Sequence, residues 1–197
     1  MEIIARFKQR VAALRRTVVF AEGDDPRIIA AARQLSDETL ARPILLADVD
    51  VARRVAAEAN ITIDDLDIRD PQNSPRLGEF ERIYSHGRPK ANAKVAARAV
   101  RRPLFHASLM VKAGDAAAMI AGVSCPTGRV IEAGLLGIGL AEGIHTPSSC
   151  FLMVIPDVAG TGSRNLLFAD CAVNVDPSAV ELADIAIASA DSAMRLL

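Results

Sequence analysis

The most informative segment of this chain reads LLFADCAVNVDP, from Leu166 to Pro177. An apolar run there ends in an acid, a thiol and an amide, and the segment predicts that a helix begins at its last two residues, Asp176 and Pro177. An aspartate can cap the free amides of a first helical turn, and a proline loses no hydrogen bond there. Open α/β sheets bind ligands at such strand-to-helix junctions, where backbone N–H groups face an anion. The segment therefore predicts an α/β fold with a ligand site that includes Asp170 and Asn174.

Outward from this segment, short apolar runs alternate with stretches of helical spacing. One predicted helix runs from Pro26 to Leu40 and is capped by Asp25. Strands are expected at 17–21, 43–47, 117–121, 149–155 and 166–169, and helices at 2–16, 51–59, 77–100 with a break, 103–113, 127–139 and 177–196. Strands that alternate with helices predict parallel-sheet layers covered by helices.

Composition narrows the classes of function. The 197 residues are 51% hydrophobic and carry a net charge of −1, so neither nucleic acid nor a membrane surface is an expected partner. Aromatic residues are only 4%, which disfavours base stacking. Three cysteines outside any CxxC spacing indicate reduced thiols. With no apolar run of about 20 residues and no signal-peptide core, we expect a cytoplasmic protein.

Four blocks of the sequence resemble one enzyme family. They read VVFAEGDDPR (18–27), LMVKAGDAAAMIAG (109–122), TPSSCFLMVIPD (146–157) and FADCAVNVDPSAVELADIAIASA (168–190). In this order they resemble the phosphate acetyl/butyryl transferase (phosphotransacetylase) family. The resemblance implies an isocitrate/isopropylmalate-dehydrogenase-like α/β fold of two domains. We expect residues 1–147 to form the first domain and residues 148–197 the opening of the second.

The resemblance also implies phosphate acetyltransferase activity, in which an acetyl group passes between coenzyme A and inorganic phosphate. Acetyl-CoA, phosphate and acetyl phosphate are then the small-molecule partners, coenzyme A being a substrate, and no cofactor or metal is required. The histidines His86, His106 and His145 stand far apart in unmatched contexts. The segments FADCAVN and PSSCFLM are closer to the acetyl branch, and a phosphate butyryltransferase is the alternative. We expect a homodimer.

Arginines are the phosphate-binding candidates, because a guanidinium can bind phosphate with two parallel hydrogen bonds. Arg88 follows Tyr84 and is the nearest match to one family arginine. The usual position of the other falls on Glu132, and Arg129 lies one helical turn earlier on the same face. Arg129 and Arg88 are therefore the catalytic candidates. The substrate-binding candidates are Ser124, Thr127, Lys112, Asp170 and Asn174.

Each of these residues also has a structural interpretation. Arg129 and Arg88 can be surface cations, and Lys112 can be the last-turn cation of a helix. Ser124 and Thr127 can cap a helix, and Asp170 can orient the loop beside it.

Two other functions stay open. The family's late serine-arginine segment with its aspartate is absent, so the chain can be an inactive fragment or a regulatory or interaction module. Its strands near Phe151 and Leu167 would then lack sheet partners, and its last helix would expose apolar residues and favour self-association. A dinucleotide-dependent dehydrogenase is disfavoured, because no GxGxxG follows a strand and the acidic loop from Glu22 to Asp25 would repel pyrophosphate.

Overall fold

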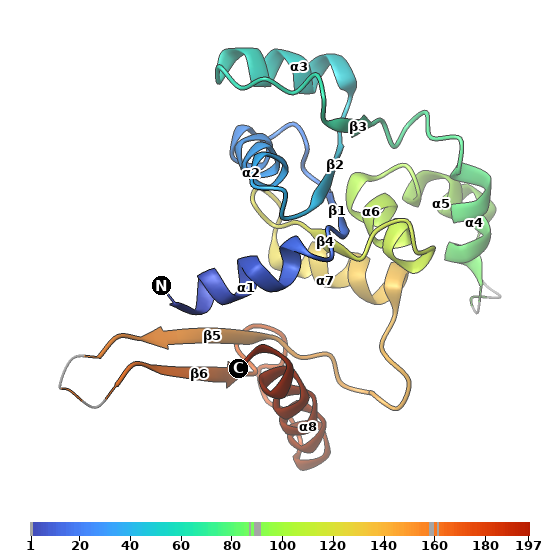
Figure 1. The fold of residues 1–197 in the computed structure, drawn as a ribbon. Helices are drawn as coiled ribbons and strands as arrows, with labels where there is room; N and C mark the ends of the chain where they lie inside the picture. Colours follow the sequence, from blue (N-terminus) through green and yellow to red (C-terminus); the bar gives the residue numbers. More distant parts are fainter. Residues whose placement is uncertain (1, 87, 89–91, 158–159, 161) are drawn as a thin grey trace. The chain divides into compact units, whose positions relative to one another are not determined.

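The computed structural model describes residues 2–86, 88, 92–157, 160 and 162–197, and its chain forms two compact units. The first unit spans Met1–Gly139 and the second Leu140–Leu197 (Figure 1). The predicted domain division, at residues 147 and 148, stays a prediction.

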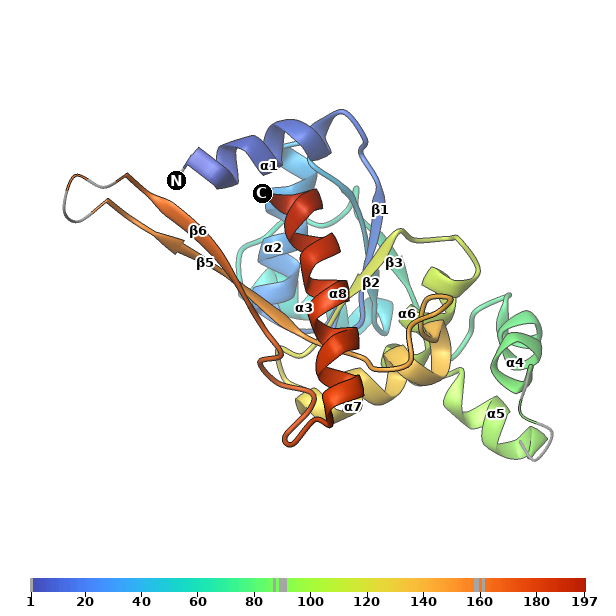
Figure 2. The same ribbon diagram turned by 90° about the horizontal axis from the view of Figure 1, so that it is seen from below.

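The first unit is built on a parallel sheet, as the alternating pattern predicted. Its strands are β1 (Thr17–Phe20), β2 (Arg42–Leu46), β3 (Asp67–Arg69) and β4 (Ala118–Ile120), in the order β3-β2-β1-β4. β1 pairs in parallel with β2 on one side and with β4 on the other, and β2 pairs with β3. Figure 2 shows the helices of this unit around the sheet.

The helices of the first unit follow the predicted spacing closely. Asp25 caps α2 by accepting the Arg27 N–H at 2.9 Å, and Pro26 takes the first helical position, both as predicted. The predicted helix over residues 77–100 is divided into α4 and α5; residues 87 and 89–91 between them lie outside the described residues. The bounds are α1 (Glu2–Ala12), α2 (Pro26–Asp37), α3 (Val49–Glu58), α4 (Leu77–Ser85), α5 (Ala93–Ala99), α6 (Pro103–Lys112), α7 (Thr127–Ala133) and the π-helix η1 (Gly134–Ile138).

Alternate side chains of the central strands belong to two apolar clusters, one on each face of the sheet. Val19 joins Phe80 of α4 and Leu109 of α6 in the first cluster. Phe20 joins Ile29 of α2 in the second. Because successive side chains of a strand point to opposite faces, a strand buried on both faces must be apolar throughout. This explains why β1 and β2 are apolar after their first residues, Thr17 and Arg42.

The second unit differs from the expectation of a parallel sheet. Its strands β5 (Cys150–Ile155) and β6 (Arg164–Ala169) pair antiparallel with each other, so the prediction that they would lack partners was wrong. A parallel pair needs a crossover of about a dozen residues or more, and residues 156–163 are too few. The short connection therefore selects the antiparallel ribbon.

The last helix also begins later than predicted. α8 (Ala179–Leu196) is capped by Ser178, whose hydroxyl accepts the Glu181 N–H while the Glu181 carboxylate accepts the Ser178 N–H. This reciprocal capping box satisfies two free donors, whereas a cap at Asp176 satisfies fewer, so the predicted start at Asp176-Pro177 was wrong. As predicted, α8 exposes apolar side chains, among them Ile187 and Met194.

Candidate functional site

The strand order of the first unit creates a crevice beside β1. The chain runs from β1 to β2 and β3 on one side, and returns to β1 on the other side with β4. Open α/β sheets bind ligands at such a reversal, outside the carboxyl ends of the strands. Glu22 follows β1 at this edge, and residues 122–125 follow β4.

Glu22 joins these two loops through its carboxylate. Oε2 accepts the N–H of Gly122 at 2.6 Å and of Val123 at 2.9 Å. Oε1 accepts the N–H of Ser124 at 2.7 Å, the Ser124 hydroxyl at 2.6 Å and the N–H of Cys125 at 2.8 Å. We call this arrangement the Glu22 clamp. It fixes the path of the chain between β4 and α7.

The Glu22 clamp holds a charge in a buried place. Glu22 is only 6% exposed. Burial opposes ionisation, but the hydrogen bonds from Ser124, Val123 and Gly122 outweigh it and lower the pKa of Glu22 from 4.5 to about 2. Glu22 is thus an ionised carboxylate whose charge is met by five donors, and not the free repelling charge that the sequence suggested.

Gly23 lets the chain leave β1 in this direction. Its N–H donates to the Leu46 carbonyl at 3.1 Å. A Cβ at Gly23 would lie 2.9 Å from Leu45 Cβ and 2.9 Å from the backbone N and O of Leu46, closer than real Cβ contacts. Only glycine therefore permits the close approach to β2 that precedes α2.

A cavity of about 380 Å³ opens beside the Glu22 clamp. Two arginines, Arg102 and Arg129, line it together with Ser124. The other lining residues are Ala21, Glu22, Asp24, Pro103, Leu104, Phe105 and Cys125. We call this cavity the switch-point cavity. Its lining combines two arginines with apolar residues such as Leu104 and Phe105, which suits an anion that carries a small apolar group.

Arg129 and Ser124, both predicted site residues, thus lie in one cavity. Arg129 pairs with Glu132 at 3.1 Å, and the two side chains are 61% and 42% exposed. The capping interpretation of Ser124 and Thr127 was wrong: α7 follows Pro126 without a side-chain cap, because the Ser124 hydroxyl is bound to Glu22. Thr127 is the first residue of α7 and is not among the described residues that line the cavity.

Arg102 was missed by sequence reasoning. It immediately precedes Pro103, the first residue of α6, and its side chain is exposed. An arginine followed by a helix-starting proline is a local signal. This signal predicts where α6 begins. It does not predict that α6 lies beside the loop after β4, because that position depends on the whole fold.

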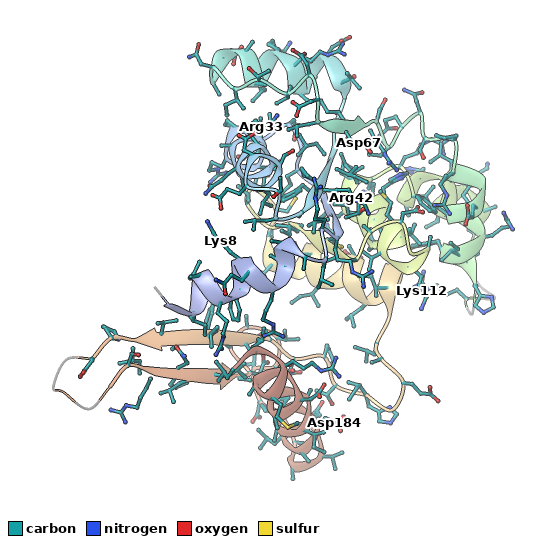
Figure 3. The ribbon with its side chains drawn as sticks, in the orientation of Figure 1. Lys8, Arg33, Arg42, Asp67, Lys112 and Asp184 are labelled. Carbon is teal, nitrogen blue, oxygen red and sulfur yellow. The ribbon has the colours of Figure 1, made fainter. Side chains whose placement is uncertain are left out.

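Arg88 and Lys112 lie together at a second cavity of about 540 Å³. The Arg88 guanidinium donates to the carbonyls of Tyr84, at 2.7 Å, and Leu136, and lies 4.6 Å from the centre of the Tyr84 ring. Lys112 is the last residue of α6 (Figure 3), where a cation suits the helix dipole. The wall of this second cavity also includes Arg82, His86, Leu135, Leu136, Gly137, Ile138 and Gly139. Arg88 thus already stabilises the packing of α4 against η1.

Asp170 organises the loop after β6 in the second unit. Its carboxylate accepts the N–H of Ser149 at 2.8 Å, the Ser149 hydroxyl, and the N–H groups of Ala172 at 3.3 Å and Val173 at 3.2 Å. It also accepts the Asn174 N–H at 2.5 Å and the Asn174 side-chain amide at 2.9 Å. Burial opposes ionisation, but these hydrogen bonds, led by the Ser149 hydroxyl, lower the pKa of Asp170. We call this arrangement the Asp170 clamp.

The Asp170 clamp supports the loop-orienting interpretation of Asp170. Asn174 belongs to the same network, since its side-chain amide also donates to the Pro147 carbonyl at 2.8 Å. Asp184 of α8, labelled in Figure 3, accepts the Thr146 hydroxyl at 3.1 Å and ties the preceding segment to the helix. A substrate contact from Asp170 or Asn174 stays a prediction.

Cys125, Cys150 and Cys171 are free. Burial raises the pKa of the Cys125 thiol, and the nearby Glu22 carboxylate raises it further, so this thiol is not activated as a nucleophile.

Within the described ranges, no group of three His, Cys, Asp or Glu side chains is placed to hold a metal ion. Nor does any helix among them have the length and apolarity that a bilayer span needs.

The sequence and the fold both match known proteins. The family model for phosphate acetyl/butaryl transferase matches residues 2–197. Phosphate acetyltransferases of Clostridium acetobutylicum and Treponema pallidum are 34% and 32% identical, over 92% and 98% of this chain. A phosphotransacetylase from Streptococcus pyogenes superposes with a TM-score of 0.90 at 26% identity, over 99% of this chain and 58% of that one. This chain spans 55% and 58% of the length of the two curated relatives.

Proposed function

The chain belongs to the phosphate acetyl/butaryl transferase family, and from this premise we propose that it transfers an acetyl group between acetyl-CoA and inorganic phosphate. The products are acetyl phosphate and coenzyme A. The switch-point cavity is the observation that carries this proposal, because it brings Arg129 and Ser124 to the edge of the sheet where open α/β folds bind ligands.

Arg129 is the proposed phosphate ligand. Its present partner is Glu132, and both side chains are largely in solvent. Exposed ion pairs contribute about 0–1 kcal/mol, so a phosphate dianion can displace Glu132 at little cost. The guanidinium can then bind two phosphate oxygens at once. The apolar wall, including Leu104 and Phe105, suits the acetyl group.

In the proposed reaction a phosphate oxygen attacks the thioester carbonyl of acetyl-CoA, the carbon–sulfur bond breaks, and coenzyme A leaves as its thiolate. Negative charge develops on the carbonyl oxygen, and fixed donors lower the barrier most where charge develops. Arg129 would hold the phosphate in position for attack, beside Ser124 in the same cavity wall. Thr127, the first residue of α7, is a further proposed substrate-binding residue outside that wall.

The remaining predicted residues have less direct proposed roles. Lys112 would attract a phosphate of coenzyme A at the second cavity, where Arg82 adds positive charge. Arg88, which donates to the carbonyls of Tyr84 and Leu136, would support that cavity. Asp170 and Asn174 are proposed substrate-binding residues of the loop after β6. We also propose a homodimer, supported by the exposed apolar residues of α8, and a cytoplasmic location, supported by the free cysteines.

The test is phosphate-dependent release of coenzyme A from acetyl-CoA, with butyryl-CoA as the competing substrate. We expect activity with acetyl-CoA in the unmodified chain and at least a tenfold loss of kcat/KM in Arg129→Ala, about 1.4 kcal/mol. Arg53→Ala is the matched control, because Arg53 is an exposed arginine of α3. A faster reaction with butyryl-CoA would instead favour a phosphate butyryltransferase.

A binding or interaction module without catalysis is the second candidate. It is favoured by the present engagement of Arg129 with Glu132 and of Arg88 with two carbonyls. A folded chain that releases no coenzyme A from either thioester would support this candidate and exclude the transferase.

A further inference from the structure

We propose that Arg102 is a second phosphate-binding residue, which acts with Arg129 at the switch-point cavity. This inference rests on the proposed function. The two guanidinium groups come from different elements, Arg102 from the start of α6 and Arg129 from the first turn of α7, and both line the same cavity.

The position of Arg102 at the N-terminus of α6 favours an anionic ligand. It is the N-cap residue of α6, at the positive end of the helix dipole, where a cation is unfavourable. The first turn of α6 has no acidic residue to offset it. Among the described residues Arg102 makes no ion pair, whereas its neighbour Arg101 lies 3.7 Å from Glu81. A bound dianion would relieve this unfavourable arrangement.

The acids in and near the cavity leave Arg102 without an ion pair among the described residues. The Glu22 carboxylate is taken by the five donors of the Glu22 clamp. Asp25, nearby in sequence, is bound by Arg27 at 2.7 Å. Asp24 is the remaining acid in the cavity wall. Arg129 pairs with Glu132, so Arg102 is the arginine of this cavity that makes no ion pair among the described residues, and its guanidinium is open to a phosphate.

Arg102 also accounts for a departure from the family pattern. The expected arginine position falls on Glu132, which now pairs with Arg129. With a carboxylate competing for one guanidinium, a second cation beside the cavity strengthens binding of the same phosphate. Arginine suits this position because its planar fork can bind two oxygens.

The experiment measures two quantities in Arg102→Gln, with Arg101→Gln as the matched control. The first is the KM for phosphate at saturating acetyl-CoA. The second, which needs no catalysis, is the rise in melting temperature that inorganic phosphate causes in the chain alone. We expect Arg102→Gln to raise the KM for phosphate about tenfold, to leave the KM for acetyl-CoA within about twofold, and to abolish most of the phosphate-induced rise. Arg102→Lys should fall between the two.

Each outcome is decisive. Equal phosphate KM and equal stabilisation in Arg102→Gln and Arg101→Gln would overturn the assignment, even if the chain is an active transferase. Phosphate stabilisation that depends on Arg102 in a chain without transfer activity would support the assignment and overturn only the proposed function. An unmodified chain that phosphate does not stabilise, and whose transfer is unaffected by Arg102→Gln, would remove the assignment altogether.

Discussion

The Glu22 clamp and the Asp170 clamp solve the same problem over very different distances along the chain. Each places a carboxylate near the end of a strand and surrounds it with backbone N–H groups and one serine hydroxyl. The donors to Glu22 come from residues 122–125, about a hundred positions away, in the loop after another strand. The donors to Asp170 come from its own loop and from Ser149, 21 positions earlier and directly before the paired strand β5.

This difference separates global from local stability. Breaking the Glu22 clamp releases the contact between the loops after β1 and β4, which closes only when the whole sheet is folded. Breaking the Asp170 clamp releases one loop beside a two-stranded ribbon. Proteins open locally at much lower free energy than they unfold globally, so the two carboxylates should respond differently to the same chemical change.

The largest expected effect is that of Glu22→Gln. Glutamine offers one acceptor oxygen, so in either orientation its NH₂ group faces backbone donors that now have no partner. Because buried donors lose their full hydration without compensation, we expect the free energy of unfolding to fall by about 3–5 kcal/mol. Urea denaturation measures this, with Glu58→Gln, an exposed glutamate at the end of α3, as the control. A loss below about 1 kcal/mol would contradict the clamp.

Acid should weaken the same contact. The pKa of Glu22 is lowered from 4.5 to about 2 in the folded chain. The resulting stabilisation, about 3 kcal/mol, is complete above pH 4.5 and is lost as the pH falls toward 2. We therefore expect the stability difference between the unmodified chain and Glu22→Gln to shrink between pH 4.5 and 2. A difference that is independent of pH in this range would show that ionisation of Glu22 is not responsible.

Asp170→Asn should have a smaller and more local effect. Asparagine again removes one acceptor oxygen, but the loop concerned is partly exposed, so water can replace some lost partners. We expect a cost of about 2 kcal/mol. Amide hydrogen exchange at Ala172, Val173 and Asn174 should accelerate while exchange in β1 and β2 stays unchanged. Asp191→Asn, on the exposed face of α8, is the control. Faster exchange throughout the first unit would contradict the local character of this clamp.

The serine hydroxyls give the smallest expected effects. Ser124→Ala removes one of five donors to Glu22 and should cost about 1 kcal/mol. Ser149→Ala should cost at least as much, because the Ser149 hydroxyl also accepts the Cys171 N–H at 3.2 Å. Thermal unfolding of the two variants ranks their losses of stability. A greater loss in Ser124→Ala than in Ser149→Ala would contradict this prediction.

Local signals predicted the first unit well. The apolar runs of β1 and β2 are buried on both faces of the sheet, and the Asp25-Pro26 pair starts α2. The spacing of apolar residues and the capping residues were therefore sufficient to predict these elements. Around the second unit the same signals failed. An apolar run of six residues is compatible with either strand direction, and Ser178 with Glu181 offered a better cap than Asp176.

The candidate site was harder to predict than the fold, for a physical reason. Arg129 and Ser124 carried a sequence signal of their own, and the structure brings them together at one cavity. Glu22 read as a repelling charge because its donors lie on a distant loop, and Arg102 joins the cavity only through the packing of α6. The sequence around such residues does not show which distant residues they will contact.

The antiparallel ribbon has a consequence for insertions and deletions. Cys150 pairs with Ala169, and the next residues outward, Ser149 and Asp170, make the first contact of the Asp170 clamp. The register of the two strands therefore determines that Ser149 and Asp170 lie next to each other at the end of the ribbon. Residues can be added between Ile155 and Arg164 without changing this pairing. One residue removed from within either strand would turn the following side chains to the opposite face and separate Ser149 from Asp170.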